Sequence, residues 1–100
     1  MALPKLININ PGAGGAHFAP GSLNCLAGDV ITWSNNDPAN AHWPGQTATA
    51  TGPVTNKIFF MPNRIAAGDS SDDFRPGDSG VTLFYACSIH PQERGTIVVG

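Results

Sequence analysis

The chain has 100 residues, of which 41% are hydrophobic and only 12% are charged, and its formal net charge is −2 at pH 7. A chain of this length is expected to form one domain over residues 1–100. The charge leaves no basic surface for nucleic acid or an anionic membrane, and no apolar run is long enough to span a bilayer. Twelve Gly and nine Pro, without a collagen-like period, favour a β domain with many turns.

Several segments are predicted to be strands because they are rich in aliphatic, aromatic or β-branched residues: residues 5–9, 18–26, 30–33, 57–61, 81–86 and 95–99. Turn-rich residues 10–15 follow the first of them. Residues 40–55 are expected to be mostly irregular, and residues 68–74 to pair at a sheet edge with their acidic side chains in water. This pattern predicts an all-β fold, a Greek-key β-sandwich of about seven to eight strands.

One loop combines a thiol with an imidazole. Residues 85–95, Tyr-Ala-Cys-Ser-Ile-His-Pro-Gln-Glu-Arg-Gly, connect two apolar strands and place Cys87 and His90 three residues apart. Thiolate and imidazole donors together select copper, zinc or iron. A short loop held between strands fixes such donors before a metal arrives, which suits electron transfer with little rearrangement.

His42 is the candidate for a third donor. It lies in the polar loop that follows the β-prone residues 30–33. In a Greek-key sandwich this loop can emerge at the same end as the loop of Cys87. The three side chains would then form a His2Cys set, which is the trigonal core of electron-transfer copper sites.

These two motifs resemble those of the cupredoxins, the plastocyanin- and amicyanin-like small copper proteins. Residues 28–37, Gly-Asp-Val-Ile-Thr-Trp-Ser-Asn-Asn-Asp, followed by His42, are similar to the first ligand strand of that family. Residues 85–99 are similar to its closing loop, Cys-x-x-His-Pro-x-Met-x-Gly, in the short amicyanin-like form, and residues 18–29 resemble its second strand.

The resemblance spans nearly the whole chain and implies a sandwich that holds one copper ion, cycling between Cu(I) and Cu(II). It implies one-electron transfer with a redox partner protein, and therefore a carrier rather than an enzyme. It also implies that Ser88 steadies the ligand loops by hydrogen bonding.

Two positions depart from the family pattern. Glu93 stands where the loop usually carries its axial Met, and Trp43 stands where an Asn often follows the first His. A carboxylate oxygen favours Cu(II) over Cu(I), so Glu93 as the fourth ligand would lower the reduction potential, as in a red-copper-type site. Gln92 is the neighbouring alternative. A site without Met also leaves open small-molecule binding or catalysis at a free coordination position, or copper storage and delivery by a chaperone domain.

The two cysteines permit either one disulfide or one metal ligand plus one buried thiol. Leu23 and Cys25 alternate with polar residues, so Cys25 is expected to face the core as a small apolar side chain. A Cys25–Cys87 disulfide is the alternative and would remove the thiolate from the site. His17 is expected to be solvent-exposed and not a ligand.

The remaining expectations concern location and partners. Residues 1–10 lack the charged-then-apolar plan of a signal peptide, so the chain is either cytosolic or has lost a leader. The family resemblance favours the second reading and a periplasmic or otherwise extracytoplasmic location.

Trp43, Pro44 and Pro91 flank the candidate ligands and are expected either to form an apolar collar that docks a redox partner or simply to pack the loop. We expect a monomer.

Overall fold

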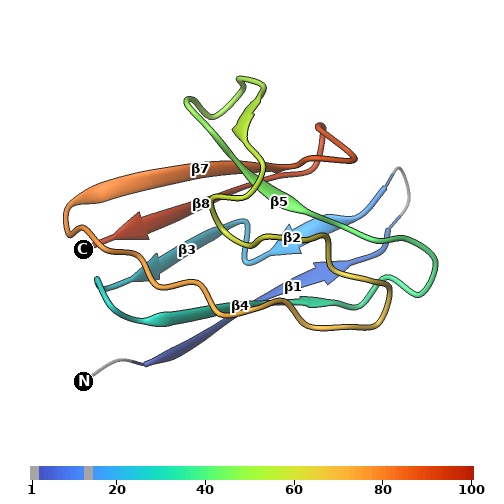
Figure 1. Ribbon diagram of the computed structural model, residues 1–100, viewed down its shortest axis with the longest axis horizontal. Helices are drawn as coiled ribbons and strands as arrows, with labels where there is room; N and C mark the ends of the chain where they lie inside the picture. Colours follow the sequence, from blue (N-terminus) through green and yellow to red (C-terminus); the bar gives the residue numbers. More distant parts are fainter. Residues whose placement is uncertain (1–2, 13–14) are drawn as a thin grey trace.

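Two β-sheets packed face to face form the fold (Figure 1) in this computed structural model, which describes residues 3–12 and 15–100. One sheet has the strand order β2-β1-β4 and the other the order β3-β8-β7-β5-β6. The strands are β1 (Pro4–Asn10), β2 (His17–Ala19), β3 (Ser22–Cys25), β4 (Val30–Asn35), β5 (Pro44–Thr47), β6 (Val54–Asn56), β7 (Val81–Cys87) and β8 (Arg94–Val99). The described residues contain no helix, and the predicted all-β sandwich is confirmed. Accordingly, nothing in the described part of the chain is a helix that could cross a membrane.

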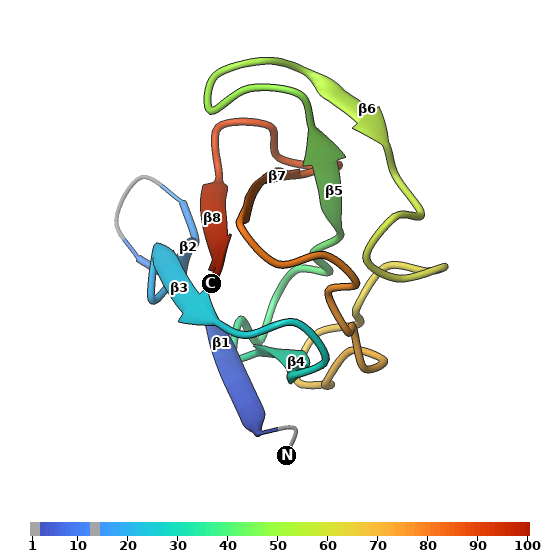
Figure 2. The same ribbon diagram turned by 90° about the vertical axis from the view of Figure 1, so that its left-hand side faces the viewer.

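The topology brings two connections to the same end of the sandwich. β1 runs parallel to β4 and β3 runs parallel to β8, whereas the other pairs are antiparallel. The β4–β5 and β7–β8 connections both lie at the right-hand end in Figure 1. The C-terminus lies at the opposite end, which faces the viewer in Figure 2. Residues from loops distant in sequence can therefore meet at one end.

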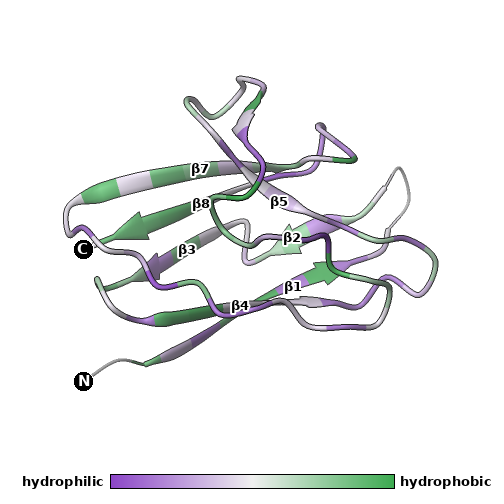
Figure 3. Ribbon diagram, in the orientation of Figure 1, coloured by the Kyte–Doolittle hydropathy of each residue, from purple (hydrophilic) through white to green (hydrophobic). Residues whose placement is uncertain are grey.

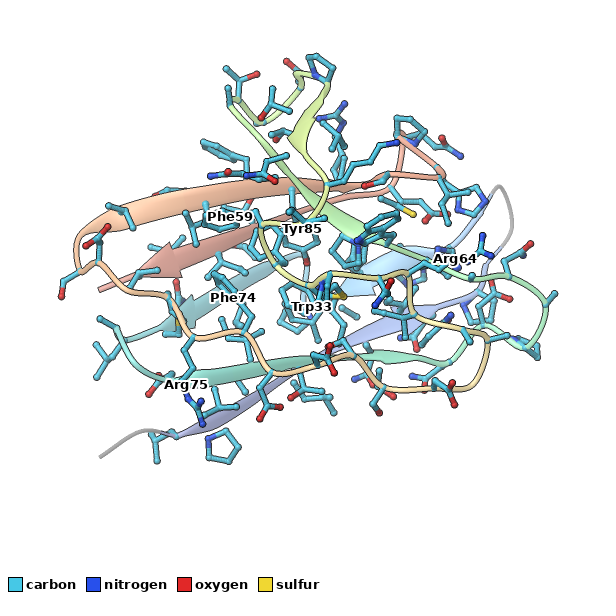
Figure 4. The ribbon with its side chains drawn as sticks, viewed as in Figure 1. Trp33, Phe59, Arg64, Phe74, Arg75 and Tyr85 are labelled. Carbon is cyan, nitrogen blue, oxygen red and sulfur yellow. The ribbon has the colours of Figure 1, made fainter. Side chains whose placement is uncertain are left out.

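Alternating burial explains why these segments form strands. In β4 every second side chain is buried, and β8 repeats this pattern, as expected for strands with one face on a core. Hydrophobic residues, green in Figure 3, are prominent along β7 and β8. Trp33 and Tyr85 meet edge to face in the core, with ring centroids 5.5 Å apart and planes at 88°, and Figure 4 shows both rings between the two layers.

Two expectations about the strands need correction, and a third missed a strand. Residues 18–26 form two strands, β2 and β3, in different sheets, because the chain turns at Pro20 and Gly21 between them. The strand expected over residues 57–61 is wrong, since Phe60 and Met61 reach the core from a turn-rich segment after β6. Residues 40–55 are mostly irregular, as expected, but the expectation did not include β5, which pairs with β7 despite its Pro-Gly-Gln-Thr sequence; pairing context here overrides weak β-propensity.

The expected edge pairing of residues 68–74 is confirmed in part. This segment meets β4 through two isolated bridges, which join Ser34 to Ser70 and Ile31 to Phe74. Asp69, Asp72 and Asp73 are exposed, as expected. The turn expected over residues 10–15 lies partly outside the described residues.

Gly95 is required by the aromatic core beside it. It pairs with Tyr85 across β7 and β8, and a Cβ at position 95 would overlap the Tyr85 ring and hydroxyl. Tyr85 is 1% exposed and packs against Trp33, Phe18 and Phe60. The ring therefore has no free space into which it could move.

We expect Gly95→Ala to lower the free energy of unfolding by about 1–3 kcal/mol, the usual cost of overpacking a filled core. Denaturant unfolding would measure the loss. Gly77→Ala is the matched control, because nothing lies within 4 Å of a Cβ built there, and a surface change of this kind costs less than about 0.5 kcal/mol. Equal stabilities of the two variants would contradict this packing account.

Asp29 closes the turn before β4 at the end of the sandwich away from the two connections. Its Oδ2 accepts a hydrogen bond from the Leu26 N–H at 2.9 Å, and its Oδ1 accepts one from the Leu3 N–H at 3.0 Å. These two donors, Leu26 first and then Leu3, hold the pKa of the Asp29 carboxyl below its ordinary value.

The contribution of Asp29 to stability should therefore be fully present above its unfolded-state pKa and be lost as the pH falls through its lower folded-state pKa. We expect Asp29→Asn to be less stable than the parent at neutral pH, with the difference shrinking as the pH falls below the ordinary pKa of an Asp carboxyl. Unfolding midpoints of both proteins across this range would test it. Asp78→Asn, at an exposed carboxylate, is the control, and a pH-independent difference for Asp29→Asn would refute the assignment.

Candidate metal centre

Cys87 ends β7 with its side chain fully buried. Its strand partner in β5 is Pro44, so the residue before Pro44 lies beside the sulfur. The Trp43 N–H donates to Cys87 Sγ at 3.4 Å, and the Ser88 N–H donates to the Trp43 carbonyl at 2.7 Å. Main-chain contacts thus hold the β4–β5 and β7–β8 connections against each other at the sulfur.

Some groups around the Cys87 sulfur raise the pKa of its thiol and others lower it. Burial raises the pKa of the Cys87 thiol, and the Glu93 carboxylate adds to this effect. Backbone N–H groups of Trp43, Ile89 and His90 act in the opposite direction, because they stabilise the anion. A buried thiolate without a cation is costly, whereas a thiolate bound to a metal is surrounded here by donors that suit it.

Two backbone hydrogen bonds to Ile65 hold His42 in place. Its N–H donates to the Ile65 carbonyl at 3.1 Å, and its carbonyl accepts from the Ile65 N–H at 2.7 Å. The ring is 1% exposed, and its Nδ1 lies 3.8 Å from Cys87 Sγ and 2.9 Å from Glu93 Oε1. The side chain therefore reaches the sulfur from the connection that follows β4.

A tight turn supplies the other two donors. The Glu93 N–H donates to the His90 carbonyl, and the Cys87 N–H donates to the Glu93 carbonyl, both at 2.9 Å. His90 Nδ1 lies 3.6 Å from Cys87 Sγ and 3.6 Å from Glu93 Oε1. Glu93 is buried, whereas the His90 side chain is 29% exposed.

One ligand atom from each of His42, Cys87, His90 and Glu93 lies within 4.8 Å of the other three. The donors are one sulfur, two imidazole nitrogens and one carboxylate oxygen, gathered from two loops at one end of the sandwich. Sulfur and imidazole donors suit copper, and zinc also accepts this set. The residues present therefore fit a single metal ion of this class.

The structure adds a buried carboxylate that the sequence reasoning did not single out. Asp37 Oδ2 lies 2.9 Å from His42 Nε2, on the side of the ring away from the sulfur. Its hydrogen bond with His42 is the main cause that lowers the Asp37 pKa to about 2, and the Ala39 N–H contributes next. The Asp-Pro-Ala-Asn sequence is typical of a turn in which an Asp side chain binds nearby backbone N–H groups, and this signal could have identified it.

The other residues considered from the sequence fall into two groups. Cys25 is a free thiol in the core, as expected, so the Cys25–Cys87 disulfide does not form. His17 is exposed, also as expected. Gln92 is exposed whereas its neighbour Glu93 is buried.

Ser88 hydrogen-bonds between the two ligand loops through its backbone and not through its hydroxyl. Its Oγ is buried and has no hydrogen-bond partner among the described residues, because it packs over Gly45, where a Cβ would lie 2.5 Å away. The backbone N–H of Ser88 makes the contact between the loops instead. Trp43 is half-buried against the core and donates its Nε1–H to the Met61 carbonyl at 3.3 Å, while Pro91 is exposed. Trp43 therefore serves local packing at least in part.

Solved structures share this architecture. A purple cupredoxin from Nitrosopumilus maritimus superposes with a TM-score of 0.78 at 23% identity, covering 95% of this chain and 98% of that one. Reduced amicyanin with one tryptophan changed to tyrosine gives a TM-score of 0.73 at 20% identity, covering 97% and 82%. An amicyanin methionine-to-alanine variant in the Cu(I) form gives 0.71 at 21% identity, covering 99% and 82%.

Neither a protein-family model nor a curated protein matches the sequence. At these identities the solved structures establish the fold, and the convergence of the four donors is a property of this chain itself. The chain has the cupredoxin fold, and a His-Cys-His-Glu group lies at one end of it.

Proposed function

We propose that the four-residue group binds one copper ion and that the protein is a one-electron carrier. The observation that carries this proposal is the convergence of four unlike donor atoms, within 4.8 Å of one another, at one end of the sandwich. Bound copper would supply the Cu(I)/Cu(II) couple. Cys87 is the proposed thiolate ligand, His42 and His90 the imidazole ligands and Glu93 the fourth ligand.

Burial and backbone anchoring make this group suited to electron transfer. Cys87 ends a strand, His42 is held by two backbone hydrogen bonds to Ile65, and Glu93 closes a turn on His90. Donors held in this way move little when charge at the site changes. Cys87, His42 and Glu93 are also buried, which keeps water from the donors.

The similar proteins support the proposal. Amicyanin variants have been solved in oxidised and in reduced Cu(I) forms. The cupredoxin from Nitrosopumilus maritimus is described as purple, which suggests that copper sites on this fold differ in their absorption spectra. A buried Glu93, at the place in the loop where the family motif carries Met, is consistent with such a departure, and the exposure of Gln92 argues against the amide as the fourth ligand.

The proposed route for the electron is His90. Its side chain is the exposed member of the group, and it is flanked by Ile89, 43% exposed, and by Pro91, also exposed. A redox partner docking there would approach the site closely. We further propose an extracytoplasmic location and a monomeric state, as the family resemblance implies.

A small-molecule binding or catalytic site is the second candidate. It is favoured by the partial exposure of His90, whose side chain is 29% exposed, because a small molecule could approach a bound metal from that side. Azide or nitric oxide should change the spectrum of the copper-loaded protein if a position is open. An unresponsive spectrum supports the carrier alone.

Copper(II) added to the parent protein should produce an intense visible thiolate-to-copper band, and Cys87→Ser should abolish it, because a hydroxyl cannot replace the thiolate donor. Absorption titration with one equivalent of Cu(II) measures this. Cys25→Ala is the matched control, since it removes the other buried thiol and should keep the band. A band that survives Cys87→Ser would overturn the proposed site.

Glu93→Met should raise the reduction potential and shift the visible band, because a neutral thioether stabilises Cu(II) less than a carboxylate does. Voltammetry and absorption spectra of the loaded variants measure both effects. Gln92→Met is the control at the neighbouring exposed position and should leave both unchanged. If only Gln92→Met changed the potential and the band, the fourth ligand would be Gln92 instead.

A further inference from the structure

Asp37 is a buried loop residue, and both of its carboxylate oxygens make hydrogen bonds. It is 5% exposed, and its Oδ1 accepts from the Ala39 N–H at 2.9 Å. Its Oδ2 accepts from Asn40 Nδ2 at 3.2 Å and lies 2.9 Å from His42 Nε2. The carboxylate is therefore aimed at the imidazole by hydrogen bonds on both oxygens.

Asn35 extends this support into the sandwich. The last residue of β4, it is 1% exposed, and its Oδ1 accepts from the Asp37 N–H at 3.0 Å. Its Nδ2 lies within hydrogen-bond distance of the carbonyls of Asn40, Ile65 and Ala66, at 2.9, 3.1 and 3.2 Å. The end of a core strand thus fixes the backbone that carries Asp37, and this carboxylate cannot swing away from the ring without breaking buried hydrogen bonds.

A neutral imidazole carries its proton on one nitrogen only, and the partner of that nitrogen selects which one. An ionised carboxylate accepts and does not donate, and each ring nitrogen of His42 faces one: Asp37 Oδ2 lies 2.9 Å from Nε2 and Glu93 Oε1 lies 2.9 Å from Nδ1. If Nδ1 and Glu93 both bind a metal ion, Asp37 is the carboxylate that keeps the proton on Nε2. Nδ1 then presents its lone pair towards Cys87 Sγ, 3.8 Å away. A carboxylate behind an imidazole also increases the basicity of the ligating nitrogen.

We propose that Asp37 is the positioning residue of the metal centre: it fixes the tautomer and orientation of His42 and, through its charge, stabilises the oxidised ion. This inference rests on the proposed copper site and deepens it. It makes the two imidazoles unequal. Both lie near Glu93 Oε1, at 2.9 Å for His42 Nδ1 and 3.6 Å for His90 Nδ1, but among the described residues only the His42 ring has a second carboxylate, on the side away from the sulfur. His42 would be the more electron-rich ligand.

The first test is the reduction potential of the copper-loaded Asp37→Asn protein. The amide oxygen can still accept the His42 Nε2–H, but the charge is gone, so the potential should rise while the thiolate band persists. Asp29→Asn is the control, because Asp29 is another buried carboxylate that caps backbone N–H groups but lies at the far end of β4. It should lower stability without moving the potential.

The second test is the Nε2–H proton signal of His42 in the Cu(I)-loaded protein, observed by NMR. It should be resolved and slow to exchange in the parent, remain in Asp37→Asn, and be lost or broadened in Asp37→Ala. If Asp37→Ala fails to fold, the parent and Asp37→Asn spectra still decide the matter, because an unprotected parent Nε2–H contradicts the proposal.

The outcomes separate this inference from the copper proposal. A parent protein that shows no thiolate-to-copper band sinks the proposed function itself. A normal band together with an unchanged potential in Asp37→Asn, or an equal shift in Asp29→Asn, overturns the role of Asp37 alone.

Discussion

Antiparallel pairing of β5 with β7 brings the two ligand-bearing connections together at their base. Pro44 lies opposite Cys87, and just beyond this pair the main chains of Trp43 and Ser88 remain hydrogen-bonded. The Trp43 N–H also reaches the Cys87 sulfur, so the residue next to His42 is tied directly to the thiol. The approach of imidazole to sulfur thus depends on backbone pairing, which does not rely on flexible side chains.

Charge distribution gives the buried end of the sandwich its chemical character. Cys87, Glu93 and Asp37 are potential anions that all lie within contact of one or both imidazoles and are almost fully buried. Buried charges persist in proteins when they are paired or bind a metal. A bound cation would offset this concentration of negative charge, and so many anionic groups would favour its more oxidised state.

The sequence predicted the strands and ligands that have a local residue pattern, but not the features that depend on contacts between distant parts of the chain. Strands with strict alternation, such as β4 and β8, were predictable from hydrophobic periodicity, and the His42, Cys87, His90 and Glu93 group followed from two motifs in the right order. β5 was not predictable, because its strand conformation comes from pairing with β7 rather than from its own residues. Asp37 was missed because its position depends on a turn and on distances to His42. Hydrogen bonding by Ser88 was expected from the family resemblance, but the sequence could not show that its backbone N–H makes the contact.

The central claim is that one metal ion is held jointly by the sulfur of Cys87 and by side chains from two separate loops. Copper-edge X-ray absorption of protein loaded with one equivalent of copper tests this most directly, because it identifies the atoms bound to the ion. The account predicts one sulfur, two imidazole nitrogens and a further oxygen around a single copper. A copper bound only by nitrogen and oxygen, with no sulfur neighbour, would contradict it.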